Sequence, residues 1–255
     1  MLAMERLMKM PVVQGIIERR LLVNYRVAPD ALGGILPPPF RPKLVGGYAI
    51  AGICLIRLAG VRPRGLPAGL GLHSENAAHR IAVEWDADGA THEGVYIPRR
   101  DSDSRVNTLV GGRIFPGEHQ RAAFIVHESD DYFDVALRSD DDRTRVAVRG
   151  RIVPSLPSGS VFPDIAEASA FFRRGAVGYS ATSCPGEYDG LELRIAEWRV
   201  EALAVEHVAS SFFDDATRFP AGAATFDCAL VMRGVEHSWH ALPSLSQSTS
   251  DTPAA

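Results

Sequence analysis

The sequence has few cysteines, and their placement excludes two kinds of small-protein scaffold. Among 255 residues there are only Cys54, Cys184 and Cys228, an odd number at wide spacing and without a C-x-x-C pair. Neither a disulfide framework nor a zinc knuckle is therefore indicated. Because persistent disulfides belong to oxidising compartments, we expect the protein in the cytoplasm.

Long apolar runs are also missing. The N-terminal segment holds only short apolar stretches broken by Glu5, Arg6, Lys9 and Glu18, unlike a signal peptide or a membrane span of roughly 20 apolar residues. We interpret residues 1–19 as an N-terminal helix or arm and expect no membrane association. The net charge is -4, and no basic run is interleaved with aromatic residues, so no nucleic-acid surface is indicated.

Lysine is scarce, and several catalytic motifs are absent. Only Lys9 and Lys43 among the 27 basic residues are lysines, so only these two side chains could supply the amine that a lysine-dependent mechanism needs. The sequence contains no G-x-S-x-G elbow, no phosphate-binding G-x-x-x-x-G-K loop and no G-x-G-x-x-G. His237 and His240 do not have the spacing of a metal-binding helix or strand, so we expect no metal and no cofactor.

What is present indicates a globular, mainly β protein. Hydrophobic residues make up 46% of the chain and charged residues 23%, which is enough for a core. Many short apolar runs are separated by turn residues, which favours a closed or nearly closed antiparallel barrel. Beyond the N-terminal segment, helix is expected at residues 164–175, where Asp164 can cap, and at residues 104–111. We expect one domain over residues 20–242 and a disordered tail over residues 243–255.

One candidate site lies in "TLVGGRIFPGEHQRA", residues 108–122. Glu118 and His119 are adjacent, so only one of them faces a cavity unless the Pro116–Gly117 pair bends the strand. His119 would suit proton transfer near neutral pH, whereas the alternative is a turn with both side chains in water. Arg113 adjoins apolar residues and, if buried, needs a substrate carboxylate or an internal glutamate as its partner.

A second candidate site lies in "HSENAAHRIAVEW". One strand face carries Arg80 and Glu84 among alanines, and the other carries His79 with apolar residues. Arg80 could hold a substrate carboxylate through two hydrogen bonds, or could form a surface ion pair with Glu84. Tyr25 and Tyr96, on two other predicted strands, either turn a hydroxyl into the cavity or serve packing. The mixed-charge segment that contains Arg99 and Arg100 is typical of a solvated loop.

Four segments carry a family resemblance: "GVYIPRRDSDSRVNTLVGGRIFPGEHQRAAF", "NYRVAPDALGGILPPPFRP", "SENAAHRIAVEW" and "AEWRVEALAVEHVASSFF". Together they resemble the acetoacetate-decarboxylase-like superfamily, in particular an uncharacterised bacterial branch that is a domain of unknown function, over about residues 20 to 240. The resemblance implies a bent antiparallel sheet closing into a cone-like barrel with an internal polar cavity. It also places Glu75 near the pocket rim.

The sequence differs from the decarboxylating members of this superfamily at the lysine that they use in catalysis. Decarboxylating members use a lysine shortly after a Gly-Arg pair to form a Schiff base with the ketone. Here the Gly112–Arg113 pair is followed by Gly117, Glu118 and His119 with no lysine, so Lys43 would have to fold into the pocket to replace it.

We therefore expect a small-molecule enzyme acting on a carboxylate or carbonyl compound by acid/base chemistry, of lyase, dehydratase, isomerase or cyclase type, without Schiff-base decarboxylation. The alternative is a non-catalytic binding protein of the same fold. The expected partner is a small molecule, and the sequence leaves open whether the protein forms a homo-oligomer. The predicted catalytic residues are Glu118, His119 and Arg113, and the predicted substrate-binding residues are Arg80, Glu84, Tyr96, Glu75, His79 and Tyr25.

Overall fold

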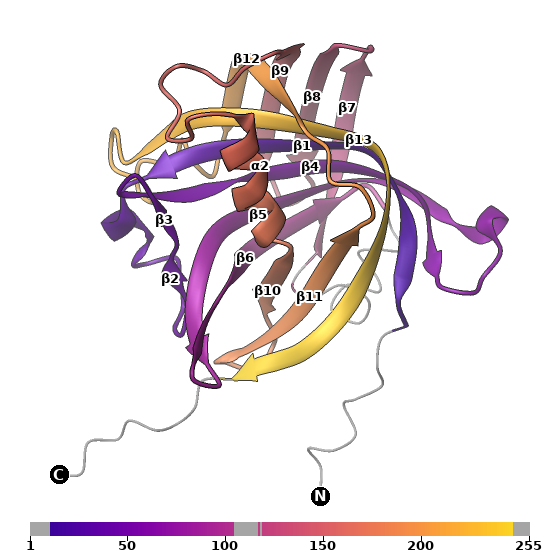
Figure 1. The fold of residues 1–255 in the computed structure, drawn as a ribbon, viewed down its shortest axis with the longest axis horizontal. Helices are drawn as coiled ribbons and strands as arrows, with labels where there is room; N and C mark the ends of the chain where they lie inside the picture. Colours follow the sequence, from indigo (N-terminus) through magenta and orange to yellow (C-terminus); the bar gives the residue numbers. More distant parts are fainter. Residues whose placement is uncertain (1–10, 105–116, 118, 247–255) are drawn as a thin grey trace, which may run out of the picture.

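A computed structural model of the chain describes residues 11–104, 117 and 119–246. Within these residues, seven strands pair edge to edge into a closed ring, because β13 pairs with β1 on one side and with β11 on the other. Figure 1 shows the ring nearly face on. In ring order the strands are β13 (Ala224–Ser246), β1 (Val13–Val27), β4 (Tyr48–Pro63), β5 (Leu72–Ala87), β6 (Ala90–Ser102), β10 (Val177–Ala181) and β11 (Glu187–Ile195).

A second layer of strands continues from the ring. It follows the order β6-β7-β8-β9-β12-β13, so it begins and ends on ring strands. Figure 1 shows these strands extending above the ring, with α2 lying across the ring. The elements are β7 (His119–Glu128), β8 (Tyr132–Ser139), β9 (Arg145–Val153), β12 (Glu201–Ser210), α2 (Ile165–Arg174), the short strands β2 (Arg41–Pro42) and β3 (Leu44–Val45), and the 3-10 turns η1 (Pro29–Leu32) and η2 (Ala68–Leu70).

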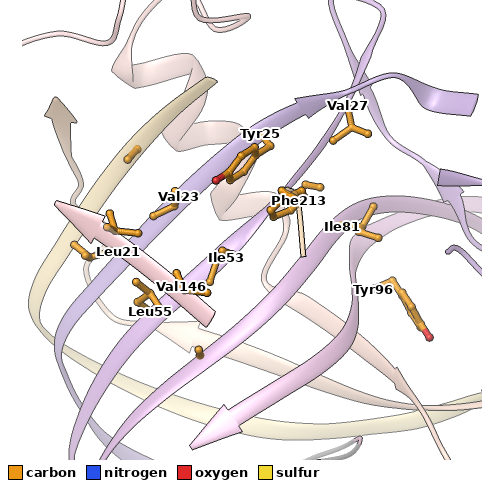
Figure 2. Packing of buried hydrophobic residues seen from close by; sticks show 14 of the residues in the cluster. Leu21, Val23, Tyr25, Val27, Ile53, Leu55, Ile81, Tyr96, Val146 and Phe213 are labelled. Carbon is orange, nitrogen blue, oxygen red and sulfur yellow. The ribbon is translucent and has the colours of Figure 1, made fainter. Parts of the chain in front are cut away.

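Two hydrophobic clusters lie on opposite faces of the ring strands, because successive side chains of a strand point to opposite faces. In β1, Leu21 belongs to the cluster that the ring shares with β8 and β9, whereas Leu22 belongs to the cluster that packs against α2. Figure 2 shows the first cluster, in which Leu21 and Val23 lie near Leu55 and Val146. The ring wall is therefore buried on both faces, and the face under α2 lines its interior.

The mainly β fold with a bent sheet that closes on itself is confirmed. The predicted helix at residues 164–175 is also confirmed, since the Asp164 carboxylate accepts a hydrogen bond from the Glu167 backbone N–H at 2.8 Å and α2 ends before Gly175. The helix predicted at residues 104–111 lies, except for Ser104, outside the described residues. No helix in the described ranges is long and apolar enough to cross a membrane.

Three details differ from the sequence-based expectations. Strand β1 begins at Val13, so residues 13–19 are not a helix or arm; their alternating burial pairs them with β4 and β13. Strand β13 runs on to Ser246, where it pairs with β11. The sheet is not wholly antiparallel, because β6 runs parallel to both β10 and β7.

Candidate functional site

A pocket of about 150 Å³ opens inside the strand ring under α2. At such a volume a protein cavity can hold a molecule the size of benzene. Phe171 and Phe172 on α2 form one wall, and Ala78, Val95 and Leu191 contribute to the strand wall. The lining is mostly apolar. Charged groups enter it from β1, β5, β6 and Lys43, and an imidazole enters it from β7.

Arg80 lies in this pocket, as its place on the alanine-bearing face of β5 predicted. Its side chain passes over Gly52 on β4, and Nη2 donates to Asn24 Oδ1 on β1. Its guanidinium lies 4.8 Å from the centre of the Phe172 ring, and its buried Nε–H has no hydrogen-bond partner in the described part of the chain. Burial and the repulsion of Arg20 lower the Arg80 pKa to about 10, so the side chain stays charged at neutral pH.

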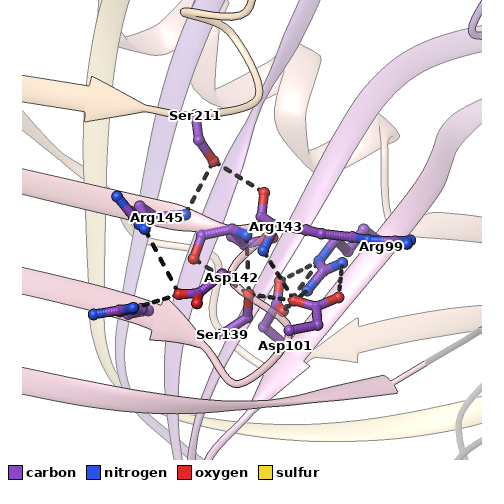
Figure 3. Close-up of polar contacts among 10 residues, drawn as sticks. Arg99, Asp101, Ser139, Asp142, Arg143, Arg145 and Ser211 are labelled. Carbon is purple, nitrogen blue, oxygen red and sulfur yellow. Dashed lines mark hydrogen bonds and ion pairs between the residues drawn. The ribbon is translucent and has the colours of Figure 1, made fainter.

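Arg100 is a pocket residue that the sequence analysis missed. It lies on β6 rather than in a solvated loop, and its Nη1 donates to Ser180 Oγ on β10 at 3.0 Å. Burial lowers its pKa to about 10. The neighbouring Asp101 does not neutralise it, because that carboxylate pairs with Arg99 at 2.8 Å. Figure 3 shows Arg99 held between Asp101 and the acidic turn after β8.

His119 starts β7 and pairs in register with Arg100. Its Nδ1 lies 3.2 Å from the carbonyl oxygen of Gly117, so Nδ1 carries the proton and Nε2 the lone pair. Burial and the positive charge of Arg100 lower its pKa to about 4, so the imidazole is neutral at pH 7. Gly117 has φ 86°, which makes the predicted bend, and a Cβ there would lie 2.7 Å from Ser180 Cβ.

Arg20 and Cys54 occupy the pocket wall next to Arg80. Arg20 Nε donates to Cys54 Sγ at 3.3 Å, and its buried Nη1 has no hydrogen-bond partner among the described residues. Arg20 was not singled out from the sequence because it directly follows the segment interpreted as an arm, and Cys54 lies in an apolar run that gives no signal for a pocket residue.

Lys43 also lines the pocket, although no lysine was expected there. Its backbone N–H donates to the Ala82 carbonyl at 2.9 Å, which holds residue 43 against β5 and turns the side chain into the ring. Its Nζ pairs with Glu93 and lies 4.9 Å from the Phe171 ring centre. Burial and the neighbouring Arg174 lower the Lys43 pKa.

Three predicted substrate-binding residues lie on the opposite face of the ring wall. Tyr25 stacks on Phe213 with ring centres 4.0 Å apart (Figure 2). Tyr96 packs against Phe40, with ring centres 5.5 Å apart. His79 is 1% exposed and packs 4.7 Å from Phe212. Side-chain alternation separates all three from Arg80, so their observed contacts are packing contacts.

Two of the three predicted carboxylates form ion pairs away from the pocket. Glu75 accepts from Arg19 Nη2 at 2.5 Å and from Arg57 Nε at 2.6 Å, in a buried network. Glu84 is half-buried and lies 3.8 Å from Arg41 Nε at the edge of the sheet. Arg113 and Glu118 lie outside the described residues. Of the predicted site, the structure therefore brings together Arg80 and His119.

Solved structures share this fold. Acetoacetate decarboxylase from Legionella pneumophila subsp. pneumophila str. Philadelphia 1 has a TM-score of 0.59 at 12% identity, over 92% of this chain and 88% of that chain. An acetoacetate decarboxylase-like enzyme from Sphingomonas wittichii RW1 has a TM-score of 0.55 at 13% identity, over 91% and 92%. The enduracididine biosynthesis enzyme MppR, complexed with pyruvate, has a TM-score of 0.58 at 14% identity, over 96% and 93%. At these identities the likeness establishes the fold and not the reaction.

Sequence comparison gives the family. A search of the curated proteins finds no match. The family described as "Uncharacterized conserved protein (COG2071)", DUF2071, matches residues 17–234, which is most of the chain. The chain therefore belongs to the DUF2071 family, on the acetoacetate decarboxylase-like fold.

Proposed function

We propose that the ring pocket binds a small carboxylate that carries a carbonyl group, and that the protein is an enzyme that moves a proton on it. The observation that carries the proposal is the presence, in one pocket, of a neutral imidazole and of a guanidinium whose Nε–H has no hydrogen-bond partner among the described residues. The pyruvate complex of the enduracididine enzyme supports the choice of a carboxylate with a carbonyl group as the probe.

In the proposed reaction, Arg80 binds the carboxylate and orients it over the apolar floor of the pocket. His119 Nε2 takes a proton from the carbon next to the carbonyl, and the electron pair of the broken C–H bond moves onto the carbonyl oxygen. Return of the proton to another atom gives an isomerisation, and loss of a group from the next carbon gives an elimination. Both are lysine-independent steps.

The charge of the bound ligand changes the pKa of His119, the proposed base. In the free protein the repulsion of Arg100 contributes to the low pKa of His119. An anion bound in the pocket offsets that repulsion, which raises the His119 pKa toward its ordinary value and makes Nε2 a stronger base. Proton transfer is therefore favoured only when the pocket is occupied.

A test follows from proton exchange. With 2-oxobutyrate in D₂O, we expect the protein to accelerate exchange at the carbon next to the carbonyl, followed by NMR. The His119→Asn variant should lose this rate at least a hundredfold, since general-base catalysis contributes roughly that much or more. Arg173→Met, which removes an exposed charge from the same helix as Phe172, is the control and should keep the rate.

Reduction with borohydride during turnover checks the lysine-independent part of the proposal. We expect no 2-oxobutyrate adduct on Lys43, because its ammonium is held by Glu93. An adduct found there by mass spectrometry would contradict this and assign Schiff-base chemistry instead.

A second candidate function is binding without catalysis. It is favoured by the lining, which is mostly apolar and whose described carboxylates, Glu93 and Asp101, are already paired with Lys43 and Arg99. Binding of 2-oxobutyrate with no exchange would support this candidate over the enzyme. Neither binding nor exchange would contradict both.

A further inference from the structure

The part of the pocket wall formed by described residues has an excess of positive charge. Its charged side chains are four cations, Arg20, Lys43, Arg80 and Arg100, and two carboxylates, Glu93 and Asp101. Both carboxylates are engaged by Lys43 and Arg99. In the described ranges, the guanidinium groups of Arg20, Arg80 and Arg100 contact an Sγ, an amide oxygen and a hydroxyl oxygen respectively, and none of the three contacts a carboxylate. Burial of cations without anionic partners is costly, so the pocket is suited to an anionic ligand.

The three arginines form two centres. Arg20 and Arg80 lie close enough for their repulsion to lower the Arg80 pKa. Arg100 is directed to the other side of the pocket, because its Nη1 donates to Ser180 on β10 whereas Arg80 Nη2 donates to Asn24 on β1. The positive charge is therefore divided between an Arg20–Arg80 centre and an Arg100 centre, each with hydrogen-bond donors to offer.

Strand register separates the two centres. Cys54 on β4 pairs with Ala78 on β5, and Ala78 pairs with Arg100 on β6. Arg20 contacts the Cys54 end of this row, two strand spacings or about 10 Å from the Arg100 backbone, and the Arg80 side chain extends from β5 toward that same end. Because the Arg100 side chain extends the opposite way, toward β10, a short chain with an anionic group at each end suits the two centres.

The pocket wall between the two arginine centres is apolar. Cys54 and Ala78 line the pocket on the strand side, and Phe171 and Phe172 line it from α2. Methylene groups placed between the two charged ends would contact carbon and sulfur rather than polar atoms. Hydrogen-bonding groups in the middle of a ligand would be left without partners there.

Resting on the proposed function, we propose that the ligand of the ring pocket carries two anionic groups at the ends of a short apolar chain, one bound by Arg20 and Arg80 and the other by Arg100. Each guanidinium presents several N–H donors in a planar fork that suits a carboxylate. Short dicarboxylates, including those with a carbonyl group next to one carboxylate, are the ligand class that meets these requirements.

The test compares two probes of one shape and different charge. Glutarate carries two carboxylates, and its monoamide replaces one of them by an uncharged carboxamide. By calorimetric titration of the full chain, we expect glutarate to bind at least tenfold more tightly than the monoamide. Arg100→Met should reduce glutarate affinity to that of the monoamide and leave monoamide affinity within about twofold, since a tenfold change corresponds to one lost charged contact. Arg173→Met, the surface control, should change neither.

The other possible results of these titrations contradict the inference in different ways. Equal affinities of glutarate and monoamide in the wild type would overturn the two-anion inference and leave the proposed carboxylate pocket standing. No binding of either probe or of 2-oxobutyrate would overturn both. A glutarate preference that survives in Arg100→Met would overturn the assignment of Arg100. Should that variant not fold, Arg100→Lys keeps the charge, and loss of its glutarate preference together with retained monoamide binding would indicate that the planar fork is needed.

Discussion

At the residue scale, side-chain alternation along a strand determined which predicted residues meet. Arg80 was predictable because small residues accompany it on one face of β5, and His119 because a bend precedes it. The sequence could not show whether Tyr25 and Tyr96 face the pocket or the opposite side of the ring wall. Their strands are buried on both faces, and an aromatic ring packs equally well on either. The sequence predicts a loop at Arg100 because "PRRDSD" is polar, whereas pairing with β5 and β7 places it in the sheet.

Buried neutral histidines make stability depend on pH. The ring nitrogens of His79 are buried without a hydrogen-bond partner among the described residues, and burial with the charges of Arg99 and Arg218 lowers its pKa to about 3. The unfolded chain, with an ordinary histidine pKa near 6.5, binds this proton more readily, so the free energy of unfolding falls as the pH drops from about 6.5 toward 3.

We predict that His79→Leu reduces this dependence. Between pH 7.5 and pH 5.5, urea unfolding of the wild type should show a loss of stability, and the variant should lose about 1.4 kcal/mol less, the equivalent of one pH unit for one proton. His73→Leu, at an exposed position, should keep the wild-type dependence. A variant at position 79 with the full wild-type pH dependence would show that His79 is not buried as a neutral group.

At the element scale, most strands and α2 could be predicted from periodicity and caps, but their ends and partners could not. Strand β1 starts at Val13 because tertiary pairing with β4 and β13 extends it into a segment whose charged residues suggested an arm. The apolar segment that starts at Leu44 is divided into β3 and β4, because Gly46 and Gly47 adopt positive φ and make a tight turn.

Close approach of β1 and β4 positions the Arg80 side chain. A Cβ on Gly52 would lie 2.3 Å from the Val23 carbonyl oxygen and 3.3 Å from Asn24 Oδ1, the acceptor of the Arg80 hydrogen bond. We predict that Gly52→Ala lowers the free energy of unfolding by about 2 kcal/mol, in the range of overpacked sites, and weakens 2-oxobutyrate binding.

The control for this prediction is Gly34→Ala, where a Cβ would meet nothing within 4 Å and φ is ordinary. Urea unfolding and calorimetric titration of both variants make the comparison. Equal stability of the two variants would contradict the close approach of β1 and β4 at this point.

At the scale of the whole molecule, the fold class was predictable and the topology was not. Many short strands indicated a closed sheet, and this is confirmed. The ring closes, however, through the pairing of β11 with the long β13 and through the parallel pairing of β10 with β6, which bring together segments far apart in the sequence. Local patterns carry no information on such partners. The pocket under α2, with its excess of arginine, exists only because of this closure.

The protonation state of His119 tests the central claim, a cationic ring pocket whose bound anion activates a neighbouring base. Ring-nitrogen NMR signals of His119, assigned by their loss in His119→Asn, would be followed from pH 7.5 to pH 5.5 with and without saturating 2-oxobutyrate. In the free protein we predict a neutral imidazole throughout, because its pKa is about 4, and with the ligand a pKa shifted up toward its ordinary value, so that titration enters this range. A His119 that already titrates there in the free protein, or that does not respond to the ligand, would contradict the account.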